Sequence, residues 1–196
     1  FGLPTGDFTF NGNSWLPQSP IGISTLQNSI VVQSGVANLN LDLSCASIYV
    51  LNKATLNLGH SMNLQIADSL FNDGEIVLSN GCEILQLDSS AINVNGGSGS
   101  YRIMSTIQAT AADRFKLWSS PLNDVSIENC FGNTNASDRY AYQSGGQNPG
   151  YKSYVNGIMQ AGAAYAVTPN IPMVAGSQNF SDSVQFVGSQ LNNGDI

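Results

Sequence analysis

The chain is organised by a ladder of very short apolar pairs, which runs from Leu39 to Val94. One residue separates the two members of each pair, so in an extended strand both side chains point to the same face. The pairs recur about every eight to twelve residues, with Asn, Ser, Asp and Gly between them, and no helical spacing is present. They are Leu39/Leu41, Ile48/Val50, Leu56/Leu58, Leu64/Ile66, Ile76/Leu78, Leu85/Leu87 and Ile92/Val94.

Two arrangements of such strands compete. An antiparallel meander favours longer strands joined by tight two-residue loops. A β-solenoid instead alternates short strands with turns and stacks the apolar pairs of successive coils. Gaps such as Gly59-His60-Ser61 favour the solenoid, although spacing alone leaves a sandwich open because it does not give strand order.

A Gly/Ser-rich run at residues 95–100 marks the clearest change in composition. It divides the chain into a capped β-solenoid domain, 1–97, and a β-sandwich-like domain, 98–196. The proline-containing segment before residue 29 is expected to cap the first coil. The strands expected in the second domain are 101–108, 114–118, 126–128, 140–143, 164–168 and 183–187, with a loop over 144–154.

Charge excludes several classes of partner. Only 10% of the residues are charged and the net charge is −7, so neither nucleic acid nor an anionic membrane surface is expected to bind. No apolar run is long enough for membrane insertion. Abundant Asn, Ser and Gly fit a secreted or cell-surface β protein. Because the chain starts at Phe1 rather than Met, we expect a mature or trimmed product.

The three cysteines fit no zinc-binding spacing. Either all three are buried thiols that act as small apolar side chains, or Cys45 and Cys82 form a disulfide between neighbouring rungs. A catalytic thiol is not expected, because the only histidine is His60, which follows Gly59 in a turn.

Clustered carboxylates would indicate a polysaccharide-acting β-helix enzyme. Asp68, Asp73 and Asp88 lie in or near the ladder, but Lys53 is its only basic residue. Such sites usually add an Arg or Lys, and Arg102 comes only after the ladder, so we interpret these acids as solvated turn residues.

No cofactor is expected apart from a weakly indicated structural calcium ion. The chain lacks a dense Asp-rich calcium loop, but Asp113, Asp124 and Asp138 could converge in the second half.

A Tyr-rich segment is the best binding candidate. Tyr140, Tyr142, Tyr151 and Tyr154 could contact carbohydrate, because sugar C–H faces stack on aromatic rings while hydroxyls pair with nearby amides. The alternative is that these tyrosines pack the edge of the sandwich.

Several motifs resemble those of a known family. Segments 48–58 and 72–78 look like the β-solenoid repeats of large secreted surface proteins of Bacteroidota. Segments 117–121, 157–169 and 192–196 resemble, in content and order, a module that precedes the type IX secretion sorting domain of those proteins. Two departures are Ala163-Ala164, where Lys-Gly would be expected, and the end at Ile196, where the family continues. The resemblance implies export, a role in adhesion, gliding or matrix building, and no catalytic residues.

The same resemblance points to two modification sites. Asp68-Ser69-Leu70 and Asp182-Ser183-Val184 match the short motif at which exported Bacteroidota proteins carry O-glycans, which makes Ser69 and Ser183 candidates.

Together these observations predict a non-enzymatic, extracellular structural or adhesive module. Its partners would be other copies of itself in a fibre, other surface proteins, or glycans. A polysaccharide-binding module and a β-helix polysaccharide-acting enzyme are the alternatives.

Overall fold

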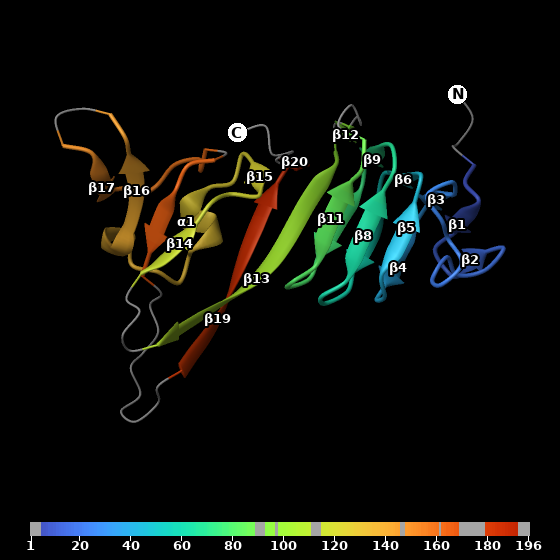
Figure 1. The fold of residues 1–196 in the computed structure, drawn as a ribbon, viewed down its shortest axis with the longest axis horizontal. Helices are drawn as coiled ribbons and strands as arrows, with labels where there is room; N and C mark the ends of the chain where they lie inside the picture. Colours follow the sequence, from blue (N-terminus) through green and yellow to red (C-terminus); the bar gives the residue numbers. More distant parts are fainter. Residues whose placement is uncertain are drawn as a thin grey trace. The chain divides into compact units, whose positions relative to one another are not determined.

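The computed structural model describes residues 5–88, 93–96, 98–110, 115–145, 148–160, 162–168 and 179–191. It contains 50% strand and 4% helix, which confirms the all-β prediction. The chain divides into two compact units, Phe1–Ile103 and Met104–Ile196, and Figure 1 labels most of their elements.

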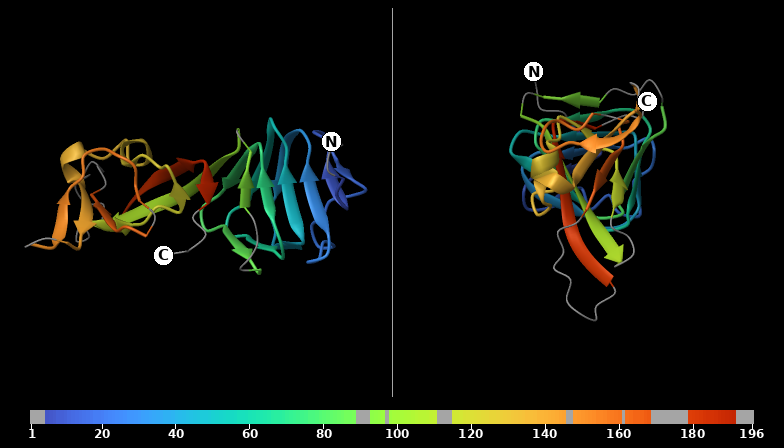
Figure 2. Two further views of the ribbon diagram at one scale, coloured as in Figure 1. Left: turned by 90° about the horizontal axis from the view of Figure 1, so that it is seen from above. Right: turned by 90° about the vertical axis from the view of Figure 1, so that its left-hand side faces the viewer.

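The first unit is a β-solenoid of about four turns, in which short strands of successive coils stack into three sheets (Figure 2). Every pairing between coils is parallel, which excludes an antiparallel meander. The first sheet holds β1 (Phe8–Phe10), β3 (Ser29–Val32), β6 (Ser47–Val50), β9 (Leu70–Asn72) and β12 (Asn93–Asn95). The second holds β4 (Gly35–Leu39), β7 (Ala54–Leu58), β10 (Glu75–Leu78) and the start of β13 (Ser100–Thr110); the third holds β5 (Leu43–Cys45), β8 (Asn63–Ile66) and β11 (Glu83–Gln86).

The core of the solenoid consists of apolar columns that run from coil to coil. In the first sheet Ile30, Ile48 and Leu70 occupy equivalent positions, and all three are fully buried. In the second sheet Leu56 lies over Ile76 in the same way. Each buried pair of the sequence ladder therefore fills one layer of the interior.

The predicted inward direction is wrong for four members of the ladder, three leucines and Val94. Leu41, Leu85 and Leu87 are 59%, 53% and 48% exposed. The parallel register places Ile84 beside Leu64, so the adjacent Leu85 must face outward. Ile92 lies outside the described residues, and its partner Val94 is 40% exposed.

The N-terminal segment supplies an edge strand, in keeping with the expected cap. β2 (Trp15–Leu16) pairs antiparallel with β1 and ends the first sheet. The side chain of Asn11 closes the intervening turn, because its Oδ1 accepts hydrogen bonds from the main-chain N–H groups of Asn13 and Ser14 at 3.1 and 3.0 Å.

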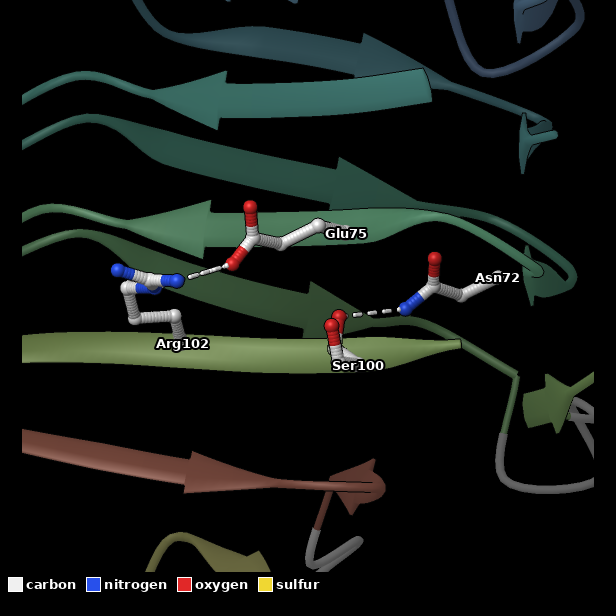
Figure 3. A network of polar contacts seen from close by, with 4 residues as sticks. All are labelled: Asn72, Glu75, Ser100 and Arg102. Carbon is white, nitrogen blue, oxygen red and sulfur yellow. Dashed lines mark hydrogen bonds and ion pairs between the residues drawn. The ribbon is translucent and has the colours of Figure 1, made fainter. Parts of the chain in front are cut away.

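One buried amide connects the last coils (Figure 3). Asn72 is only 1% exposed; its Nδ2 donates to the main-chain oxygen of Ser100 at 2.9 Å, and its Oδ1 accepts from the N–H of Gly74 at 3.1 Å. Beside it, Arg102 of β13 forms an ion pair with Glu75 of β10 at 2.7 Å. Both ionic side chains are partly exposed, so we expect the amide to contribute more stability than the ion pair.

The second unit contains a four-stranded antiparallel sheet in the order β14 (Lys116–Trp118), β18 (Tyr165–Val167), β16 (Arg139–Gln143) and β17 (Gly150–Ser153). β13 continues beyond Ile103 as the neighbour of β19 (Asn179–Gly188). β15 (Leu122–Asn123) pairs with β20 (Gln190–Leu191), and the helices are α1 (Ile127–Cys130) and the 3-10 helix η1 (Ala136–Asp138). The sandwich predicted for 98–196 is not confirmed.

Two local predictions for the second half are wrong. Most of the strand expected at 126–128 is α1, because the side chain of Ser126 caps the helix by accepting from the N–H of Asn129. β17 forms inside the expected loop 144–154, since it pairs with β16. The two compact units of the structure meet after Ile103, and residues 100–103 pair with β10 as another rung of the first unit.

The ladder can be tested with two identical substitutions. Leu64→Ala empties a 1% exposed position in the core and should lower the free energy of unfolding by about 2 to 5 kcal/mol. Leu85→Ala removes the same atoms from an exposed position and should cost less than about 0.5 kcal/mol. Urea titration followed by circular dichroism measures both; equal losses would contradict the register.

A second pair of variants tests the amide in the last coils. Asn72→Ala leaves the N–H of Gly74 and the C=O of Ser100 without their partner, which should cost about 1 to 3 kcal/mol. The control is Asn57→Ala, which removes one bond to Asn38 at the surface of the same solenoid. The two thermal melting temperatures give the comparison, and an Asn72 variant as stable as the control would rule out this role.

Candidate functional site

The four-stranded sheet of the second unit exposes one apolar face, which we call the aromatic face. It is formed by Phe115, Leu117, Tyr140, Tyr142 and Tyr151. Strand alternation brings them to one side: Leu117 pairs with Ala166, which pairs with Tyr140, and Tyr142 pairs with Tyr151. A contiguous group of exposed apolar side chains on one sheet face is typical of an interaction surface.

The aromatic rings of this face meet edge to face. The ring centroids of Tyr142 and Tyr151 are 5.3 Å apart with the planes at 66°, and those of Phe115 and Tyr140 are 5.7 Å apart at 78°. Tyr142 and Tyr151 remain 48% and 42% exposed. These contacts hold the rings in place and leave their outer surfaces available to a ligand.

No charged residue of these four strands lies on the aromatic face. Lys116 and Arg139 both pair with Val167, and Lys152 pairs with Ala141, so all three occupy positions of the opposite face. The aromatic face therefore offers rings, aliphatic groups and hydroxyls.

The opposite face of the sheet packs into the core of the unit. Trp118 contacts Phe131 and Phe186 with ring centroids 5.6 and 5.7 Å away. Arg139 is 5% exposed and donates to the main-chain oxygens of Val155, Phe131 and Thr134 at 3.0, 2.9 and 2.7 Å. This packing fixes which side of the sheet is exposed.

Three of the four predicted tyrosines lie on the aromatic face, but Tyr154 does not. Its hydroxyl donates to the main-chain oxygen of Ile158 at 2.8 Å, and its ring is tilted against Tyr165 at 5.5 Å. Burial, with the nearby Tyr165 and Glu128, raises the pKa of Tyr154. Tyr154 is therefore not part of the aromatic face, and a carbohydrate contact of this residue stays a prediction.

Sequence reasoning missed Phe115 and Leu117. The two are separated by one residue and flank Lys116, so their common face was readable from the alternation in 114–118. Their neighbourhood with the tyrosines was not, because β18 joins β14 to β16 only in the folded sheet.

A hollow of about 470 Å³ lies on the first unit. Its lining residues are Ile21, Gly22, Asn40, Leu41, Asp42, His60, Ser61 and Met62. His60 Nδ1 contacts its neighbour Ser61 Oγ at 2.5 Å. Asp42 accepts a 2.7 Å bond from the main-chain N–H of Asn63, and this bond, with the Asn63 side chain, lowers the Asp42 pKa. Asp42 thus ties one coil to the next, which accounts for its position without a ligand.

The acids considered for catalysis are not gathered around a base. Asp68 and Asp73 flank β9 at its two ends, and the Oδ1 of Asp68 accepts from its neighbour Ser69 at 2.8 Å. Arg102 is paired with Glu75 in another sheet. The positions of these residues agree better with the solvated or structural roles expected for them than with the roles of a catalytic acid and base.

The expected convergence of Asp113, Asp124 and Asp138 finds no support. Asp113 lies outside the described residues. Asp124 accepts from Ser189 at 3.0 Å, and Asp138 accepts from Asn135 at 3.3 Å. Within the part of the chain that the structure describes, no three His, Cys, Asp or Glu side chains are placed to hold a metal ion together.

Of the two alternatives for the cysteines, the structure has free thiols and not the Cys45–Cys82 disulfide, because all three cysteines are free. Cys45 ends β5, whereas Cys82 precedes β11, and β8 lies between these strands. Two strand spacings alone amount to about 9 to 10 Å, beyond the roughly 7 Å that a disulfide spans between Cα atoms. Cys45 and Cys130 are buried and Cys82 is half-buried.

The two candidate glycosylation sites differ in accessibility. Ser69 is 6% exposed and its hydroxyl donates to Asp68, so it does not offer the free hydroxyl that the prediction requires. Ser183 is exposed in β19, where O-glycosylation stays a prediction.

The fold and the site together define an all-β protein with a β-solenoid and an uncharged aromatic sheet face. The chain belongs to the family described as a domain of unknown function, DUF8693, whose model matches residues 8–196. No curated protein and no solved structure matches the chain. In the described ranges, no helix has both the length and the apolar character needed to cross a membrane.

Thiol labelling tests the cysteine assignment. Denatured without reductant, the protein should take up three alkyl groups, whereas a Cys45–Cys82 disulfide would leave one. In the native state Cys82 should react first but slowly, because burial, with Glu83 and Asp42 nearby, raises its pKa to about 11. Labelling should accelerate as the pH rises toward that value, since the thiolate is the reactive form. Intact mass spectrometry counts the labels.

Proposed function

We propose that this chain is a non-catalytic, extracellular adhesive module that binds polysaccharide through the aromatic face. The observation that carries the proposal is the exposure of Tyr142 and Tyr151 as a direct cross-strand pair on the same face as Leu117, which is itself 68% exposed. Leaving such side chains in water forgoes burial energy, so a surface of this kind indicates a ligand or partner.

Carbohydrate fits the chemistry of this face. The C–H faces of a sugar stack on tyrosine rings, and its hydroxyls can pair with the phenolic hydroxyls of Tyr142 and Tyr151. Exposed Ser153 lies on the same side of the sheet, paired with Tyr140, and adds a further hydroxyl. Both contributions that sugar recognition requires are therefore close together.

An extracellular location is supported by composition and by resemblance. A surface built from amides and hydroxyls, with 10% charged residues, suits a secreted β protein. The likeness to secreted Bacteroidota proteins adds export by type IX secretion to the proposal. The alternative of a polysaccharide-acting enzyme has less support, because Asp68 and Asp73 are set at opposite ends of β9.

Self-assembly into a fibre is the second candidate function. The strands β2 and β4 stand at the ends of the first and second sheets. The segment that contains them also carries a set of exposed apolar residues, which supports this candidate. Open strand edges beside apolar side chains favour strand addition by another chain. The exposed residues are Leu16, Ile23, Leu26, Val36 and Leu41.

Affinity electrophoresis through gels containing dissolved polysaccharides tests the first candidate. The double variant Tyr142→Ala/Tyr151→Ala should lose retardation by about ten-fold or more, because each ring contributes about 1 kcal/mol or more. Tyr49→Ala is the matched control: Tyr49 stacks on Phe71 at 4.7 Å within the first unit and is not one of the residues that form the aromatic face.

Unchanged retardation of the double variant, with a native circular dichroism spectrum, would contradict glycan binding by this face. Light scattering on the same samples tests the fibre. Mass that grows with concentration and falls in Val36→Asp would favour assembly over glycan binding.

A further inference from the structure

The aromatic face also indicates which class of glycan it suits, an inference that rests on the function proposed above. We propose that the ligand is an uncharged polysaccharide, bound as single chains rather than as a flat crystalline surface. Two features carry this step: the distribution of charge around the face and the angles between its rings.

Charge argues against acidic polysaccharides. Uronates and sulfated sugars are usually held by Arg or Lys, or through a bound cation. On this sheet Lys116, Arg139 and Lys152 all occupy positions of the opposite face, and Arg139 is buried with its guanidinium bonded to three main-chain carbonyls. No described cluster of three potential metal ligands exists to bridge a carboxylate.

The net charge points the same way. The whole chain carries 13 acidic and 6 basic residues, a net charge of −7, so a polyanion is repelled at low ionic strength. Uncharged polysaccharide meets no such repulsion. It finds rings, aliphatic surface and hydroxyls, which suit its C–H and O–H groups.

Ring geometry argues for single chains. A crystalline polysaccharide presents a plane and is best matched by coplanar rings. Here the two ring pairs are inclined at 66° for Tyr142 with Tyr151 and at 78° for Phe115 with Tyr140. Each inclined pair presents the face of one ring and the edge of the other. A flexible polysaccharide chain can adapt to this uneven surface by rotating about its glycosidic bonds.

The test compares three kinds of polysaccharide with the full chain. Soluble uncharged polymers are mixed-linkage β-glucan, galactomannan and xyloglucan; acidic polymers are alginate and polygalacturonate; the crystalline probe is microcrystalline cellulose. The expected result is retardation by at least one soluble uncharged polymer that persists in about 0.5 M NaCl, where electrostatic contributions are screened. Alginate, polygalacturonate and crystalline cellulose should bind at least ten-fold more weakly.

Two double variants distinguish the contribution of the aromatic rings from that of their hydroxyl groups. Tyr142→Ala/Tyr151→Ala should abolish retardation by the uncharged polymer. Tyr142→Phe/Tyr151→Phe keeps the rings and should retain it within about ten-fold, losing only hydroxyl contacts. The double phenylalanine variant also reports on binding if the alanine variant fails to fold.

The outcomes distinguish this inference from the proposed function. Binding confined to an acidic polymer or to crystalline cellulose, and lost in the alanine variant, would overturn the glycan class and leave glycan binding by the aromatic face in place. Absence of binding to all the polymers, or binding that both double variants retain in full, would overturn both proposals.

Discussion

The parallel register between successive coils is the constraint on which the solenoid depends. Because Ile30, Ile48 and Leu70 are exact register partners, each coil places its apolar side chains over those of the coil before it. The backbone hydrogen bonds that set this register also satisfy polar groups that would otherwise be buried and unpaired. Where the chain must turn inside this stack, a polar side chain such as Asn72 takes over the same role.

The second unit follows the same alternation with a different result. One face of its four-stranded sheet packs through Trp118 on Phe131, and the buried Arg139 bonds the surrounding loops through their carbonyl oxygens. That packing leaves the other face with exposed rings around the small Ala166. These well-held yet unburied rings are the basis of the glycan binding proposed for this sheet.

The prediction of fold and site from sequence succeeded where local pattern and tertiary environment agreed. The pairs at Leu56/Leu58 and Leu64/Ile66 were assigned to the core correctly, because the residue between the two members of each pair is polar and only one face of the strand is apolar there. Residues 84 and 85 are both apolar, so the sequence does not show which of them faces the core. Only the pairing of Ile84 with the buried Leu64 identifies Ile84 as the inward residue. The disulfide prediction failed for a related reason: spacing along the chain does not give the number of coils between Cys45 and Cys82.

The sequence by itself determined the all-β class, the short strands and the tyrosines at alternate positions, and it favoured the solenoid, since all of these follow from side-chain periodicity and turn residues. Only the tertiary structure decided the strand order that places Leu117 across Ala166 from Tyr140, the hydrogen bond that holds Tyr154 against Ile158, and the burial of Ser69. Strand order and burial depend on contacts between segments distant in sequence, and no local pattern encodes which partner a strand meets.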